Sequence, residues 1–262
     1  MVIADSLRQE HEPSMVYSIC KLIANNDYSL SQLNEIMNDK DSDQKVFSKN
    51  LKFCEDCGFI SIKSQVCECL ISYEYLTTYE SFINYISLNV FDTENNFTKL
   101  TRWFLSQDIS VSQIAAEQLA SKCHDAVTVD QNFIRGWHWW MIAFGLATVS
   151  SHIKSGGRYA LFDCSEALRR FVIDNCQENE IIKVRTFLTN LVNKKKEFKT
   201  VVDLKSNANT ICDSVSMSLR ILHNLNIIEL LYTPDSSDIW HLTESYSHKV
   251  KKDITEIRII RR

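Results

Sequence analysis

Three lysines in the first quarter of the chain share one face of a predicted helix. Lys45, Lys49 and Lys52 stand at positions i, i+4 and i+7, a spacing that aligns side chains along a helix. Ammonium groups in such a row can neutralise phosphates or donate to guanine in the major groove. We therefore expect this row to contact double-stranded DNA. The alternative is a solvated helix face, and the carboxylates of Glu55 and Asp56 dilute its charge.

Two later stretches repeat this spacing with weaker charge. Each holds one permanent cation, Arg135 in the first and Arg220 in the second. Both arginines are candidate DNA contacts if their helices turn these faces outward. The other polar residues that share the two faces are Gln131, His138, Ser216 and His223.

The densest basic clusters lie in the last third of the chain. Residues 191–262 hold 12 Lys+Arg and 9 Asp+Glu, whereas residues 1–190 hold 17 and 24. This asymmetry predicts a local basic surface on an acidic body, although chance variation in composition gives the same picture. Basic runs contact phosphates without reading sequence, and they equally often end a helix, where cations offset the dipole. The clusters are Lys194, Lys195, Lys196 and Lys199, and in the tail Lys249, Lys251, Lys252, Arg258, Arg261 and Arg262.

Two cysteine pairs have the short spacing of structural zinc sites. They are Cys54 with Cys57, and Cys67 with Cys69. Cys54 occupies an apolar helix position, and the second pair falls on one face of a predicted strand. Buried thiols are therefore the favoured interpretation, and the zinc alternative stays open. The start of the chain lacks a targeting signal, so we expect a cytoplasmic protein whose nine cysteines are mostly reduced.

The sequence offers no catalytic constellation. The seven histidines are scattered, and the pair Cys123-His124 stands alone. With five glycines, the chain holds neither a phosphate-binding loop nor a dinucleotide fingerprint. No apolar run approaches the roughly 20 residues that cross a bilayer. We expect no catalytic residues, no metal, no cofactor and no membrane contact.

The elements that position these residues repeat three times. Each copy has a polar helix start, an amphipathic helix ending in Gly or Asn, a β-branched strand, a tight turn and a second strand. A helix that leads into a β-hairpin is the second half of a winged helix. The sequence therefore predicts a mainly α fold with small β-hairpins (α+β), built from tandem winged-helix (helix-turn-helix) modules. The copies cover residues 43–72, 130–162 and 214–242.

The first copy has clear helices before it. Ser29 with Gln32 forms a capping box, which opens a short helix with Leu30, Leu33, Ile36 and Met37 facing inward. In the second copy Trp137 and Trp140 share a core face, whereas Trp139 points elsewhere. Base stacking by these tryptophans is the less favoured alternative.

The third copy is less regular. Ile181–Val192 reads as a helix by periodicity, residues 229–233 and 239–242 read as its hairpin, and Ser245–Arg262 reads as a basic helix. The predicted domains are residues 1–75 (winged-helix domain 1), 76–95 (helical linker), 96–175 (winged-helix-like domain 2) and 176–262 (winged-helix domain 3 with a basic C-terminal helix).

The middle of the chain resembles a known family. Residues Asn96–Asp108, and Trp140–Leu146 followed by Phe162–Leu168, resemble accessory proteins of bacterial DNA-modification and phage-defence clusters. The nearest family is the G component of the 7-deazaguanine DNA-modification (Dpd) systems. The resemblance implies a DNA-associated restriction or defence role, with other cluster proteins as partners. It transfers no functional residue to this chain.

Two functions follow from these observations. The first is a non-catalytic DNA-binding and targeting subunit of a bacterial multiprotein complex, with double-stranded DNA and other subunits as partners. The alternative is a protein–protein adaptor with little DNA contact, as tandem winged helices serve in chromosome-organising ATPase complexes. The net charge of −4 favours the adaptor. So does an aromatic linker with Tyr73, Tyr75, Tyr79, Phe82 and Tyr85.

Overall fold

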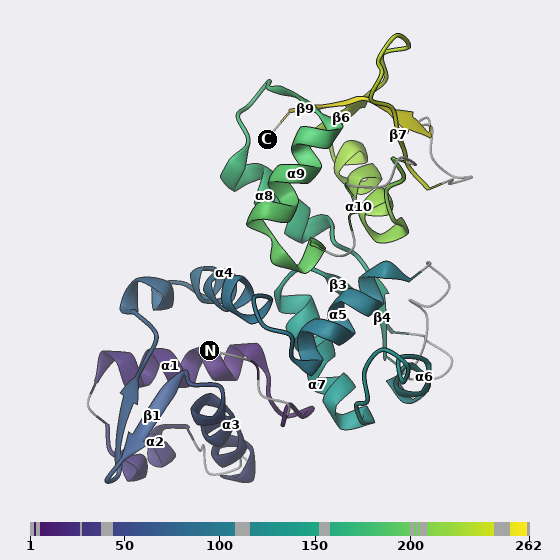
Figure 1. The fold of residues 1–262 in the computed structure, drawn as a ribbon. Coiled ribbons are helices and arrows are strands. Elements are labelled where there is room, and N and C mark those ends of the chain that lie inside the picture. Colours follow the sequence, from purple (N-terminus) through teal and green to yellow (C-terminus); the bar gives the residue numbers. More distant parts are fainter. Residues whose placement is uncertain are drawn as a thin grey trace. The chain divides into compact units, whose positions relative to one another are not determined.

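The fold combines helices with small antiparallel sheets, which confirms the predicted α+β class (Figure 1). The computed structural model describes residues 3, 6–26, 28–37, 44–107, 116–151, 158–199, 202, 204, 209–243 and 252–260. The chain packs into two compact units. Unit 1 comprises Met1–Lys99 and Ala116–Phe144, and unit 2 comprises Leu100–Ala115 and Gly145–Arg262. The division of the sequence into three domains stays a prediction.

Unit 1 is largely helical, with one β-hairpin. A helix, α5 (Asn96–Ser106), runs from unit 1 into unit 2. The other elements of unit 1 are α1 (Pro13–Asn25), α2 (Leu30–Met37), α3 (Gln44–Asp56), β1 (Ile60–Lys63), β2 (Val66–Cys69), the 3-10 helix η1 (Tyr73–Leu76), α4 (Tyr79–Val90), α6 (Ala116–Lys122) and α7 (Gln131–Ala143).

The predicted capping box at the start of α2 is confirmed. The Ser29 amide donates to Gln32 Oε1 at 2.9 Å, and the Gln32 amide donates to Ser29 Oγ at 3.4 Å. Leu33 is fully buried, but Ile36 is 50% exposed, so the inward orientation predicted for Ile36 is wrong. A helix of two turns has room for few core positions, and here Leu33 fills the central one. The side chain of Met37 lies outside the described residues.

The first predicted hairpin is also confirmed. Gly58 takes φ +70° after α3, and a two-residue turn with φ 49° at Ser64 and φ 71° at Gln65 joins β1 to β2. The strands pair from Ile60↔Cys69 to Lys63↔Val66. An antiparallel bridge between Ser29 and Val66 adds the segment before α2 alongside β2. The spatial order is therefore the Ser29 segment, then β2, then β1.

Helix α7 supplies the centre of the core of unit 1. The Asp130 carboxylate caps it by accepting from the Phe133 amide at 2.7 Å. Trp137 and Trp140 are fully buried, which confirms their predicted core role. The indole Nε1 of Trp140 donates to the carbonyl of His11 at 3.0 Å. This bond holds the N-terminal arm, residues 6–12, against the core of unit 1.

Gly136 in α7 allows the same arm to lie close to the helix. A Cβ at this position would stand 2.4 Å from the Arg8 carbonyl oxygen and 2.9 Å from Leu7 Cγ. Gly136→Ala gains up to about 1 kcal/mol of helix propensity but forces the arm away, which costs about 1–3 kcal/mol. We expect the midpoint of thermal unfolding to fall. A higher midpoint would show that the arm moves aside at no cost.

Unit 2 contains the remaining small sheets and several helices. None of the described helices in either unit is long and apolar enough to span a membrane. Besides the second half of α5, its elements are β3 (Ala147–Ser151), β4 (Arg158–Phe162), α8 (Ser165–Asn175), β5 (Ile181–Lys183), α9 (Val184–Lys194), the 3-10 helix η3 (Lys196–Phe198), α10 (Asp213–Asn224), β6 (Ile228–Leu231), β7 (Trp240–His241), β8 (Asp253–Ile254) and β9 (Glu256–Ile259).

The strands of unit 2 pair differently from the sequence-based prediction. Strands β3 and β4 form the expected hairpin. However, β6 pairs with β9, and β7 pairs with β8, so the predicted pairing of 229–233 with 239–242 is wrong. Strand β5 also pairs with β9, which gives a three-stranded sheet of order β5-β9-β6. The connection between β6 and β9 is therefore long, and it contains the two-stranded sheet of β7 and β8.

Two segments that were predicted to be helical contain strands instead. Ile181–Lys183 is a strand, and the helix begins only at Val184. The basic C-terminal helix is wrong for residues 252–260, which form β8 and β9. In β9 the buried Ile257 and Ile259 alternate with half-buried Glu256 and Arg258, the period of two that fits a strand.

Candidate nucleic-acid interface

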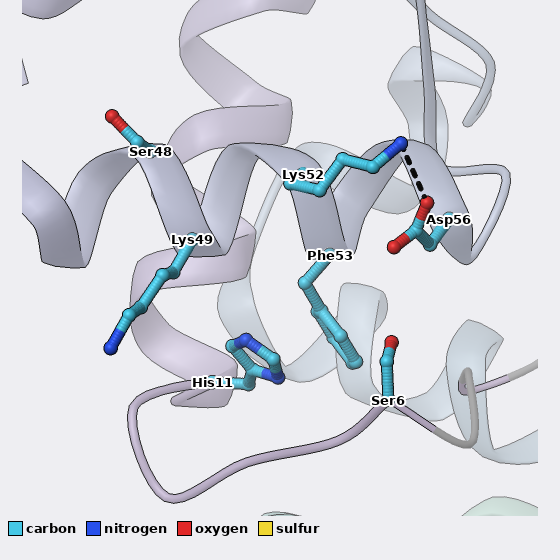
Figure 2. Close-up of a pocket in the computed structure, with 7 residues that line it drawn as sticks. All are labelled: Ser6, His11, Ser48, Lys49, Lys52, Phe53 and Asp56. Carbon is cyan, nitrogen blue, oxygen red and sulfur yellow. Dashed lines mark ion pairs between the residues drawn. The ribbon is translucent and has the colours of Figure 1, made fainter.

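Two lysines of the α3 row, Lys49 and Lys52, lie on the surface and form ion pairs with carboxylates. Lys49 Nζ lies 2.5 Å from Glu10 Oε1 in the N-terminal arm. Lys52 Nζ lies 2.9 Å from Asp56 Oδ1 (Figure 2). It also lies 3.1 Å from Glu55 Oε2. The side chains of Lys49 and Lys52 are 54% and 65% exposed. The hydrogen bonds that Lys52 donates to Asp56 and then to Glu55 raise the pKa of Lys52.

This face therefore carries little net positive charge. Exposed ion pairs contribute only about 0–1 kcal/mol each, so a phosphate could displace the carboxylates, but it would meet their repulsion. The side chain of Lys45 lies outside the described residues. Of the three predicted contacts, the structure brings Lys49 and Lys52 to one surface and supplies each with an acidic partner.

A cavity of about 310 Å³ opens beside this lysine pair. His11 stacks on Phe53 with ring centroids 4.3 Å apart, and its Nδ1 accepts from the Arg8 amide at 3.0 Å. No sequence pattern pointed to His11, because it precedes the first amphipathic helix. The lining residues are Ser6, His11, Ser48, Lys49, Lys52, Phe53 and Asp56 (Figure 2).

His11 makes the stability of unit 1 depend on pH. Burial is the main cause that lowers the pKa of His11 to about 4, against 6.5 in an unfolded chain. Below pH 6.5 the unfolded chain binds the proton and the folded one does not. Stability is therefore complete above pH 6.5 and falls by roughly 3 kcal/mol as the pH drops to 4.

His11→Gln keeps an acceptor for the Arg8 amide and removes the titration. We expect urea unfolding of this variant to depend less on pH between 6.5 and 4 than unfolding of the wild type. Equal pH dependence in the two proteins would mean that His11 is accessible to protons in the folded state.

Arg220 does not face solvent, so the prediction of an outward row on α10 is wrong. Arg220 is 1% exposed, and Ser216 is fully buried. Arg220 Nη2 donates to the Thr243 carbonyl at 2.9 Å, and the Thr243 amide donates to Ser216 Oγ at 3.2 Å. Thr243 Oγ1 also donates to Asp213 Oδ1 at 2.7 Å. Thr243, which follows β7, thus covers the face of α10 that we predicted to contact DNA.

The corresponding row on α7 is partly accessible. Gln131 is exposed, whereas Arg135 and His138 are half-buried. This row offers one permanent cation in a partly enclosed position, which is a weak phosphate site.

The lysine cluster at the end of α9 has a different character. Lys194 ends the helix, and Lys195 leads into the short turn of η3. Fully buried Phe198 anchors this turn. Glu197 is only 2% exposed, so the surface of the turn presents lysines and not its carboxylate. Within the described residues, none of the four cluster lysines forms an ion pair. The cluster comprises the exposed Lys194 and Lys199 and the half-buried Lys195 and Lys196.

The two units also differ in total charge. Unit 1 contains 10 Lys+Arg and 18 Asp+Glu, a formal charge of −8. Unit 2 contains 19 and 15, a formal charge of +4. Duplex DNA is a dense line of negative charge, so its approach favours unit 2. The basic last third predicted from the sequence, residues 191–262, lies within unit 2.

Of the basic residues in the tail, the structure describes Lys252 and Arg258. Lys252 is exposed just before β8, but Arg258 pairs with Glu229 at 2.7 Å. The tail residues Lys249, Lys251, Arg261 and Arg262 lie outside the described residues.

The cysteines are free thiols in the structure. The thiols of Cys54 and Cys69 lie in hydrogen-bonding contact with Cys20 of α1, which the sequence did not single out. The Cys54 bond and burial hold the pKa of Cys20 well above its ordinary value. In the part of the chain that the structure describes, no group of three or more Cys, His, Asp or Glu side chains could hold a metal ion.

Comparisons with known proteins identify a family. No curated protein and no solved structure matches the chain. A family model described as DpdG-like matches residues 9–236, which is most of the chain and includes the lysine clusters of α3 and α9. This match confirms the resemblance seen in the sequence. The chain therefore belongs to the DpdG-like family.

Proposed function

We propose that this chain is a non-catalytic DNA-binding and targeting subunit of a bacterial multiprotein complex, within a Dpd-type DNA-modification and defence cluster. Membership of the DpdG-like family supports the assignment to a Dpd-type DNA-modification and defence cluster. The observation that carries the DNA role is the cluster of Lys194, Lys195, Lys196 and Lys199, which has no acidic partner among the described residues and lies on the basic unit.

The connectivity of both units supports winged-helix modules. In unit 1 the order is α1, the Ser29 segment, α2, α3, β1 and β2, with β2 in the middle of the three paired segments. In unit 2 the order is α8, β5, α9, α10, β6 and β9, with β9 in the middle of the sheet. Both follow the helix–strand–helix–helix–strand–strand order of a winged helix. The β3–β4 hairpin after α7 is the candidate wing of a third winged-helix module.

The covered face of α10 changes the expected mode of DNA contact. A winged helix usually inserts its third helix into the major groove. Here Ser216 and Arg220 of α10 are buried, whereas the lysines after α9 are accessible. The contact we propose is therefore made with phosphates and reads no base sequence.

Fluorescence anisotropy with a labelled duplex tests this function. We expect the full chain to bind, and the logarithm of its association constant to fall with log salt at a slope of about −3 to −4, as four phosphate contacts predict. The titration covers about 50 to 200 mM salt. Absence of duplex binding at the lowest salt would refute the DNA role.

An adaptor role for unit 1 is the second candidate, and its charge favours it. Unit 1 carries a formal charge of −8, which repels DNA. It also exposes Tyr73 and Tyr75, which are 55% and 37% accessible. The two functions therefore suit different units of the same chain and do not exclude each other.

A further inference from the structure

One stretch of unit 1 is strongly acidic and exposes large apolar side chains. Between Lys63 and Lys99 the chain contains five carboxylates and neither lysine nor arginine. This stretch forms β2, η1 and α4. The carboxylates are Glu68, Glu74, Glu80, Asp92 and Glu94.

The same stretch holds a surface group of two aromatic side chains and one aliphatic side chain, all exposed or half-buried, that we call the tyrosine face. Tyr75 stacks on Tyr85 with ring centroids 4.2 Å apart and an interplanar angle of 16°. Leu88, 50% exposed, follows Tyr85 by three residues and so shares its side of α4. Large apolar side chains grouped on a surface mark an interaction site more often than scattered ones. The tyrosine face comprises Tyr75, Tyr85 and Leu88.

The backbone beneath this face is fixed by buried contacts. Leu76 is fully buried, and its carbonyl accepts from the Tyr17 hydroxyl of α1 at 3.2 Å. Thr78 caps α4 by accepting from the Ser81 amide at 3.0 Å. The tyrosines are thus presented on a formed surface, which reduces the entropy cost of binding.

The chemistry of the face selects a positively charged partner. Carboxylates repel DNA, so nucleic acid is a poor occupant. A tyrosine ring beside a carboxylate suits arginine, whose planar guanidinium stacks on aromatic faces and pairs with carboxylates. The chain itself contains this combination in unit 2, where Arg185 lies 5.1 Å from the Trp240 ring centroid and 2.9 Å from Asp238 Oδ1. The tyrosine face offers the ring of Tyr75 beside Glu74.

We propose that the tyrosine face docks an arginine-rich segment of another protein subunit, with guanidinium groups on the tyrosine rings and an aliphatic residue against Leu88. The inference rests on the proposed role as a subunit of a complex. It assigns protein binding to unit 1 and DNA binding to unit 2. A partner segment of this kind alternates arginine with leucine or a similar aliphatic residue.

A fluorescein-labelled peptide of alternating arginine and leucine is the probe, titrated with the full chain. We expect Glu74→Lys and Tyr75→Ala each to weaken its binding by about tenfold. Glu35→Lys is the matched control, because Glu35 is exposed on α2 of the same unit and the charge change is identical. A lysine–leucine peptide is expected to bind the wild type more weakly than the arginine peptide, since it lacks the stacking guanidinium.

Three results would overturn the proposal. They are absence of peptide binding by the wild type, equal losses in Glu74→Lys and Glu35→Lys, and sedimentation showing that the face joins two copies of the chain. All variants are also assayed for duplex binding. Glu74→Lys and Tyr75→Ala are expected to retain the wild-type salt slope, so a failure of this proposal is distinct from a failure of the DNA role. Leu88→Lys, at an exposed position, provides a further variant that cannot disturb the core.

Discussion

Alanine at Lys194, Lys195, Lys196 and Lys199 together is expected to lower duplex affinity by at least about 100-fold at low salt. These ammonium groups have no acidic partner among the described residues, so DNA phosphates need not displace one. Loss of four phosphate contacts should also flatten the salt dependence by about 3 to 4 in slope. Anisotropy titrations of the wild type and the variant measure both effects.

Lys49→Ala with Lys52→Ala is the matched control from unit 1. Both side chains already pair with carboxylates, with Glu10 for Lys49 and Asp56 for Lys52. Their removal is expected to change duplex affinity less than about threefold. If this pair lowers affinity as much as the lysines after α9 do, then α3 is the DNA-binding helix and the assignment to unit 2 is wrong.

Arg220→Ala is expected to destabilise unit 2 by about 3 kcal/mol. Arg220 is 1% exposed and its guanidinium donates to the Thr243 carbonyl, so truncation leaves both a cavity and a partly buried carbonyl that loses its donor. Urea unfolding measures the loss. Duplex affinity of the folded variant, at temperatures below its unfolding transition, is expected to equal that of the wild type.

Two further variants, one at Arg220 and one at the exposed Arg185, separate the contribution of packing to stability from that of charge. Arg220→Met keeps most of the apolar volume and is expected to lose less stability than Arg220→Ala. Arg185→Ala removes an arginine that is 45% exposed and paired with Asp238, and it is expected to cost no more than about 1 kcal/mol. A stable Arg220→Ala protein with weakened DNA binding would place α10 back at the DNA surface.

Local elements of the fold followed from the sequence because their signals are local. The Ser29–Gln32 box, the Asp130 cap and the β1–β2 turn each depend on residues within a few positions of one another. Pairing over long separations has no such signal. The partner of β6 is β9, and its Glu229↔Arg258 register could not be distinguished in the sequence from a nearer hairpin.

The candidate site shows the same limit. Spacing correctly placed Lys49 and Lys52 on an exposed face, but Glu10, far away in sequence, decides the charge around Lys49. In the sequence, Ser216 and Arg220 of α10 resemble a solvated face. In the structure both are buried, and the backbone of the distant residue Thr243 hydrogen-bonds to both side chains. Only the run at Lys194–Lys196 could be recognised from composition alone.

Cross-linking of the full chain to a duplex, with the linked lysines located by mass spectrometry, tests the division of roles most directly. We predict that cross-links fall on Lys194, Lys195, Lys196 and Lys199 of unit 2, at salt concentrations where anisotropy shows binding. Cross-links confined to Lys45, Lys49 and Lys52 of α3 would contradict the account.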